Sequence, residues 1–152
     1  MPAFCCTLER SLMSHRYSIE KAEAFVLEGI IIENVLKQGV TLETDDVLRI
    51  KEMNLNLCKG KPYALLVDPK EWSSITDEAR ALLASKELAA HNIAKAILIY
   101  TQKQKLIGNL YLQINKPAVK TRMFTSREKA LDWLRLHVTK FEAEQIMNNQ
   151  GN

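Results

Sequence analysis

The sequence predicts an α/β fold in which helices cover a mixed, mostly parallel sheet of about five strands. The chain has 152 residues, the usual size of a single domain. Two fully apolar runs of strand length occupy residues 63–67 and 93–100, a pattern typical of strands buried on both faces. Helical periodicity follows each run. Because connections between parallel strands of one sheet are right-handed, this alternation places the helices against the sheet.

The first expected elements are an antiparallel hairpin and a helix. Residues 21–27 and 30–36 are rich in β-branched and aromatic side chains, which favours strands. Residues 28–29 supply the two-residue turn between them. A helix is expected at 45–58, because Thr44 can cap it and two aspartates then place negative charge at its positive end.

Three more helices and one strand complete the expected order. Thr76 caps the second helix, and a third runs through residues 106–114. The last strand is expected at 119–124. Thr125 and Glu128 have the spacing of a capping box and begin the final helix. The predicted order is strand, strand, helix, strand, helix, strand, helix, strand, helix.

We expect one domain at residues 17–143, preceded by a flexible segment at 1–16 and followed by a frayed tail at 144–152. The tail is mostly Glu, Gln and Asn and has almost nothing to bury. No repeat or interdomain linker separates the parts of the expected domain.

Composition favours a cytoplasmic protein without a membrane span. Residues 1–16 lack the continuous apolar segment of a secretory signal. No apolar run approaches the roughly 20 residues that cross a bilayer. The odd number of cysteines, Cys5, Cys6 and Cys58, implies no disulfide framework, which fits a reducing compartment.

The sequence predicts no catalytic residues, no metal site and no cofactor. Ser73, Ser74, His91 and Asp68 supply the residue types of a hydrolase, but no nucleophile elbow frames either serine. The three histidines are too far apart in sequence to form a metal-binding pair. The five glycines form no phosphate-cradling loop. We therefore expect a non-enzymatic protein.

Charge is unevenly distributed along the chain. Residues 93–129 hold eight Lys or Arg against one Glu, a net charge of +7. Residues 20–58 carry a net charge of −4. Because the whole chain carries only +3 and has no nucleic-acid-binding motif, we expect solvated helix faces and no specific nucleic-acid binding.

Gly108 lies inside the third expected helix, where a glycine costs about 1 kcal/mol relative to alanine. Such a glycine usually allows another group to approach closely. One interpretation is tight core packing. The alternative is a ligand groove, lined by Ile107, Gly108, Tyr111 and Ile114, that admits a small apolar molecule or a partner helix.

The turn after the central strand is the predicted partner-binding surface. Open α/β sheets bind ligands at loops that leave the carboxyl ends of strands. A tryptophan in this turn can anchor a partner or cover the core. The predicted residues are Asp68, Trp72, Ser73, Ser74, Thr76, Asp77 and Glu78.

Several segments, together with the element order, carry a family resemblance over residues 21–138. They include Thr41-Leu42-Glu43, Gly60-Lys61-Pro62, Leu65-Leu66-Val67-Asp68, Ser74-Ile75-Thr76, Ile107-Gly108-Asn109 and Ile114-Asn115-Lys116-Pro117. In these the chain resembles the SpoIIAA-like branch of the STAS superfamily, the anti-sigma-factor-antagonist fold, among its bacterial members of uncharacterised role.

The resemblance implies a SpoIIAA-like fold and a regulatory module that binds a protein partner, with a homodimer as an open alternative. In the best-known members, a serine at the start of the helix after the central strand is phosphorylated. Asp77 stands about where that serine would be, which implies an unswitched member. Our second hypothesis is a carrier or sensor of a small apolar ligand, and the third is an unrecognised hydrolase.

Overall fold

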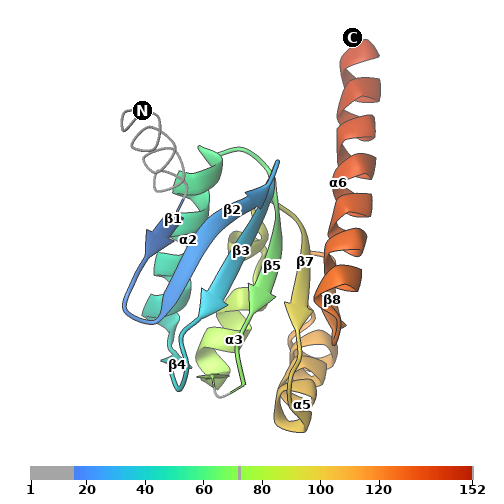
Figure 1. Cartoon of the computed structure of the whole chain (residues 1–152). Coiled ribbons are helices and arrows are strands. Elements are labelled where there is room, and N and C mark those ends of the chain that lie inside the picture. The colour runs from blue at the N-terminus through green and yellow to red at the C-terminus, as the bar shows by residue number, and fades with distance from the viewer. Residues whose placement is uncertain (1–15, 72, 152) are drawn as a thin grey trace, which may run out of the picture.

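The computed structural model describes residues 16–71 and 73–151 and contains a main sheet of six strands (Figure 1). Their order across the sheet is β1-β2-β3-β5-β7-β8. The bounds are β1 Arg16–Ser18, β2 Ala22–Glu28, β3 Ile31–Leu36, β5 Tyr63–Asp68, β7 Asn92–Leu98 and β8 Thr121–Phe124. The first two pairs are antiparallel and the other three are parallel. The predicted mixed, mostly parallel sheet is confirmed, with β1 as an additional edge strand.

The helices follow the predicted order, but two of them are divided. Their bounds are α2 Thr44–Cys58, α3 Asp77–Ala84, α4 Lys86–Ala89, α5 Gln102–Leu110, the π-helix η1 Tyr111–Asn115 and α6 Arg127–Gln150. α3 and α4 replace the second predicted helix, and α5 and η1 replace the third. A second, two-stranded sheet joins β4 (Thr41–Leu42) to β6 (Ser74–Ile75). This small sheet was not predicted, since each strand is only two residues long. In the described part of the chain, no helix is both long and apolar enough to cross a membrane.

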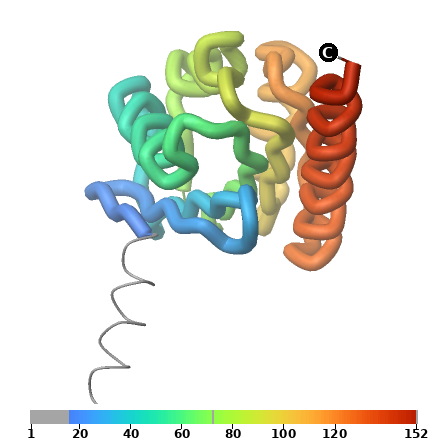
Figure 2. The backbone as a smooth tube through the Cα atoms, turned by 90° about the horizontal axis from the view of Figure 1, so that it is seen from above, coloured from blue at the N-terminus to red at the C-terminus, as the bar shows by residue number. Residues whose placement is uncertain are grey.

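The two faces of the main sheet are covered differently. Seen from above, α6 (red) lies on one side of the sheet, and α2 and α3 lie on the other (Figure 2). We call these sides the α6 face and the α2 face. Because side chains alternate along a strand, neighbouring residues of β5 serve different faces: Leu66 packs toward α6, whereas Leu65 faces α2.

The α6 face is closed by small, fully buried side chains. Four alanines and two leucines form its centre: Ala64, Ala94, Ala96, Ala130, Leu66 and Leu134. A single methyl group lets the helix backbone approach the strands, so this side reaches the dense packing of a protein interior. The α6 face therefore fixes the position of the sheet against its longest helix.

Two helix caps differ from the prediction by one residue. Thr44 is the first residue of α2, and Glu43 is the N-cap, with its backbone N–H donating to Asp46 at 2.8 Å. Ser126, not Thr125, caps α6 and accepts from the N–H of Lys129 at 3.3 Å. Both corrections reflect the choice between adjacent residues that can serve as caps. The predicted Thr76 cap is confirmed, since its hydroxyl accepts from Ala79 N–H at 3.2 Å.

Several element ends also differ from expectation. The second helix breaks at Ser85, whose extended backbone ends α3 and whose hydroxyl caps α4. Both of the last strands are shorter than predicted. β7 ends at Leu98 instead of residue 100, and β8 begins at Thr121 instead of residue 119. The segment expected to be a frayed tail is helical through Gln150. Residues 1–15, most of the expected flexible segment, lie outside the described residues.

Replacing Leu134 with alanine should lower the free energy of unfolding by about 2–5 kcal/mol, because its fully buried side chain leaves a cavity in the α6 face. The matched control is Leu136→Ala on the same helix, whose side chain is 51% exposed and should cost about 0.5 kcal/mol or less. Urea unfolding of both variants measures the difference. Equal losses would contradict the assignment of the α6 face.

Candidate functional site

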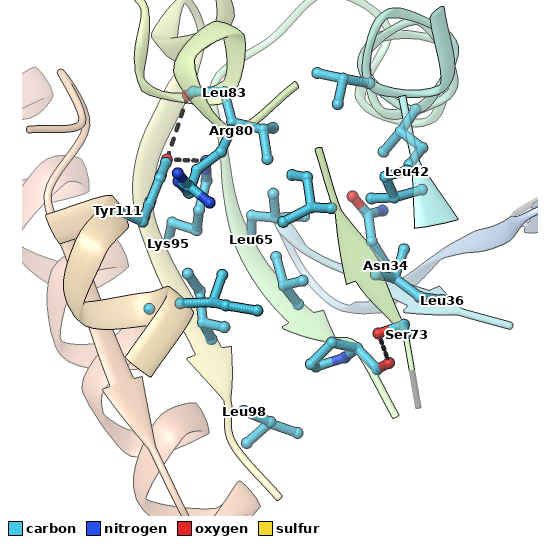
Figure 3. A pocket seen from close by; sticks show the side chains of 18 of the residues that line it. Asn34, Leu36, Leu42, Leu65, Ser73, Arg80, Leu83, Lys95, Leu98 and Tyr111 are labelled. Atoms are coloured by element: carbon cyan, nitrogen blue, oxygen red, sulfur yellow. Dashed lines mark hydrogen bonds between the residues drawn. The ribbon is translucent and has the colours of Figure 1, made fainter. Parts of the chain in front are cut away.

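A cavity of about 160 Å³ lies between the α2 face of the sheet and helices α2, α3 and α5 (Figure 3). Its wall is mostly apolar. Leu65, Val67 and Ile97 line it from the sheet, while Ile50 of α2 and Leu83 of α3 line it from the helices. The volume is close to that of an engineered apolar cavity of about 150 Å³ that binds benzene. The site can therefore hold a single ring or a short chain.

Lys95 places an ammonium group in this apolar wall. The residue is only 5% exposed, and its Nζ donates to the hydroxyl of Tyr111 at 3.1 Å. Burial, together with the charge of Lys51, lowers the pKa of Lys95 to about 8. The sequence interpretation of residues 93–100 as fully apolar was wrong at this residue. Lys95 also belongs to the basic stretch of residues 93–129, but its side chain is buried and not on the surface.

The hydroxyl oxygen of Tyr111 accepts the hydrogen bond from the ammonium of Lys95. The hydroxyl itself donates to the backbone carbonyl of Leu83 at 3.3 Å. Burial raises the pKa of Tyr111, so the phenol stays neutral at physiological pH. Tyr111 begins η1, and π-helical turns occur often at functional sites.

Two further cations line the cavity, and both have acceptors. Lys51 Nζ donates to the hydroxyl of Tyr63 and to the carbonyl of Leu88, each at 2.9 Å, and to the carbonyl of Ala90. Burial lowers the pKa of Lys51. Arg80 donates from Nε to Asn115 and from Nη2 to Asp77, each at 2.9 Å. These bonds hold the two side chains in fixed positions.

Three asparagines also line the cavity. Asn34 and Asn54 are both 2% exposed, and their amides exchange two hydrogen bonds of 2.7 and 2.9 Å. Each amide thus satisfies the other, as buried polar groups require. Asn92 differs, since its Oδ1 is the one buried side-chain N or O atom of the described residues without a hydrogen-bond partner. This acceptor also lines the cavity.

The predicted ligand groove coincides in part with the cavity. Ile107, Gly108 and Tyr111 line it, whereas Ile114 is 70% exposed and does not. A methyl group added at Gly108 would lie 2.1 Å from Sδ of Met123 in β8. The close-packing interpretation of the glycine is therefore supported as well, with a strand side chain as the approaching group.

The predicted partner-binding turn divides into different environments. Ser73 and Ser74 line the cavity; Ser73 donates to the carbonyl of Pro69, and the hydroxyl of Ser74 lies 2.8 Å from that of Thr41. Three other residues of the turn do not line it: Thr76 caps α3, and Asp77 and Glu78 are exposed in the first turn of that helix. Trp72 lies outside the described residues.

Asp68 was predicted on an exposed surface and is buried instead, with 4% exposure, on the α6 face. Its carboxylate accepts from the hydroxyl of Tyr100 at 2.9 Å and from Nζ of Lys70 at 3.2 Å. Burial and this carboxylate raise the pKa of Tyr100 to about 12. Nearby, Nη1 and Nη2 of Arg127 donate to the two oxygen atoms of the buried Glu33 carboxylate, at 2.6 and 2.5 Å. The pair of Arg127 and Glu33 joins the start of α6 to the sheet.

Sequence reasoning missed Lys51, Arg80, Lys95, Asn34 and Asn92 as lining residues. Only Lys95 carried a signal, because a lysine within a run of buried strand residues needs an explanation. The others are brought to the cavity by the packing of α2, α3 and the strand ends, which local sequence does not indicate.

Comparison with solved structures finds a protein with the same fold. It is the crystal structure of an uncharacterised protein of the DUF3478 family, with a SpoIIAA-like fold, from Shewanella loihica. The match has a TM-score of 0.55 and 14% sequence identity, and covers 78% of this chain and 97% of that one. At this identity the likeness concerns the fold alone, and it confirms the predicted SpoIIAA-like fold.

Comparisons of the sequence identify a family of unknown function. No curated protein of described function matches the chain significantly. The family model described as a domain of unknown function, DUF7793, matches residues 25–138. This match covers most of the sequence, including all the main-sheet strands from β3 onward and most of the cavity wall. The chain therefore belongs to the DUF7793 family.

Proposed function

We propose that this domain binds one small, largely apolar molecule in the cavity between the sheet and helices α2, α3 and α5, as its carrier or sensor. The observation that carries the proposal is the cavity itself, about 160 Å³ with a mostly apolar wall. Protein interiors are otherwise packed with few voids larger than a water molecule. An apolar occupant would shield the lining side chains from water.

The hydrophobic effect favours an apolar occupant of this cavity. Removing apolar surface from water is worth about 25 cal/mol per Å², and the wall is mostly apolar. An apolar molecule that enters the cavity would therefore gain free energy from burial of its own surface and of the lining.

The bonding of the serines supports binding rather than hydrolysis. Ser73 and Ser74 line the cavity, and in the described residues neither serine is bonded to a histidine or to a carboxylate that could act as a base. The protein-interaction role that the sequence favoured first stays a prediction, as does a cytoplasmic location.

Lys95 provides a second energetic sign of a binding site. Its pKa falls from the usual 10.5 to about 8, and each unit corresponds to 1.36 kcal/mol, so holding it charged costs roughly 3 kcal/mol. The unfolded chain binds its proton more tightly. Stability should therefore rise as pH increases from 8 to 10.5, and the full cost should be present below pH 8.

Replacing Lys95 with methionine should raise the free energy of unfolding at pH 7 and remove this pH dependence. The advantage of Lys95→Met over the unmodified chain should shrink between pH 8 and 10, because the native lysine then loses its charge. Urea unfolding of both proteins at each pH measures the difference, in which the shared tyrosine titrations cancel. A difference that does not vary with pH would show that Lys95 is not held in a desolvated site.

The cavity should bind a simple apolar probe, and filling it should abolish binding. We expect toluene to shift the backbone amide NMR signals of lining residues such as Leu65 and Ile107 in the unmodified protein. Val67→Trp should prevent these shifts, because Val67 lines the cavity and indole occupies much of its volume.

Val35→Trp is the matched control for this test. Val35 is also a half-buried strand valine, but it pairs opposite Asp68 on the α6 face and does not line the cavity. The Val35→Trp variant should therefore still bind toluene. The proposal fails if toluene leaves the lining residues of the unmodified chain unshifted, or if it binds equally well to Val67→Trp.

A further inference from the structure

The charged side chains that the structure shows in the cavity lining are all basic. Lys51 from α2, Arg80 from α3 and Lys95 from β7 are cationic, and among the described residues no Asp or Glu lines the cavity. Buried charges in proteins are normally paired, because removing a single ion from water costs several kcal/mol. An apolar cavity with three cations in its wall therefore favours an anion over a neutral molecule.

Lys95 is the cation with the fewest acceptors. Lys51 donates to three oxygen atoms, and Arg80 reaches an amide oxygen and a carboxylate. The ammonium of Lys95 has three N–H donors, and the described residues supply one acceptor, the hydroxyl of Tyr111. Because that hydroxyl directs its own proton to Leu83, it cannot donate to a ligand at the same time.

We propose that the molecule bound in the cavity is a small apolar acid whose carboxylate is held by Lys95. This inference rests on the proposed function and names the chemical class of the ligand. The apolar body would lie against the strand and helix side chains, and the carboxylate would accept from the free donors of Lys95. Figure 3 shows the hydroxyl of Tyr111 bonded both to Lys95 and to Leu83, and Arg80 is a further cation of the same lining.

The lining favours a carboxylate over a phosphate. Phosphate sites in proteins use several convergent donors, commonly backbone N–H groups at a helix N-terminus or a glycine-rich loop. Here the wall is mostly apolar, and among the described residues the free charged donors belong to two side chains, Lys95 and Arg80, and not to a row of backbone N–H groups. One carboxylate on a single ring or short chain matches both that charge and the volume of about 160 Å³.

The proposal gives a defined dependence of binding on pH. The titratable and charged groups that line the cavity with Lys95 are Lys51 of α2, Tyr63 of β5, Arg80 of α3 and Tyr111 of η1. Burial raises the pKa of both phenols, so neither becomes an anion near pH 8. Lys95 itself has a pKa of about 8 in the empty site. Carboxylate affinity should therefore fall as pH rises above 8.

The test compares sodium benzoate with benzamide, a neutral molecule of nearly the same shape. We expect benzoate to bind the unmodified chain at least about tenfold more tightly at pH 7, the effect of a charge-assisted hydrogen bond. In Lys95→Met this preference should disappear, while benzamide affinity changes less than about threefold. NMR titration of the lining amides gives both dissociation constants.

Two controls separate the role of Lys95 from general effects. Lys129→Met removes an exposed lysine outside the cavity and should keep the full preference for benzoate. In the unmodified chain, raising the pH from 8 to 9 should weaken benzoate about fivefold, the loss of one proton from a group with a pKa of about 8, and leave benzamide unchanged. This second measurement needs no variant and so does not depend on the folding of Lys95→Met.

The outcomes distinguish this inference from the proposed function. Benzoate binding no tighter than benzamide, or a preference that persists in Lys95→Met, would overturn the assignment of a carboxylate ligand and leave the cavity as a neutral apolar site. Toluene binding without benzoate binding would overturn it equally. Failure of all three probes to bind would reject the cavity as a ligand site, and the inference with it.

Discussion

The packing of α6 against alanines of the central strands determines how the rest of this domain is arranged. Ala64, Ala94 and Ala96 present only methyl groups on one face of the sheet, and Ala130 meets them from the helix. A helix can approach such a surface closely, so one long helix suffices to close the face. Glu33 and Arg127 hold the start of the helix in register.

The opposite face cannot close in the same way. There the strands carry larger and polar side chains, among them Tyr63, Leu65, Asn34 and Lys95. The helices that cover them rest on these side chains and on one another, and a cavity is left between the layers. Lys51 joins α2 to Tyr63 of the sheet and to Leu88 of α4 at this cavity. The asymmetry of the two faces thus produces both a closely packed scaffold and a cavity.

The order of elements was predictable because each depends on local patterns, while the site depended on packing. Apolar runs and helical spacing located β5, β7 and α6, and adjacent cap residues account for the one-residue errors at Thr44 and Thr125. Of the residues in the predicted groove, Ile107 and Tyr111 line the cavity. Ile114 does not, because η1 is a π-helix, whose wider turn rotates this residue away from the face that α-helical spacing assigns.

Two other errors have a similar origin. The sequence places Asp68 at the end of a strand but does not show which face its side chain takes, and the α6 face buries it beside Tyr100. Lys95 was counted as part of a basic surface because charge sums do not distinguish buried from exposed residues. Its neighbours in the cavity come from α2, α3 and η1, and only the tertiary structure brings them together.

The central claim is that Lys95 anchors an acid inside this cavity, and a crystal structure with 4-bromobenzoate tests it most directly. Anomalous scattering locates the bromine atom without relying on the shape of weak density. The account predicts one bromine site between the sheet and helices α2, α3 and α5, with the carboxylate at hydrogen-bond distance from Nζ of Lys95. Bromine found only on the outer surface, or a carboxylate directed away from Lys95 within an occupied cavity, would contradict it.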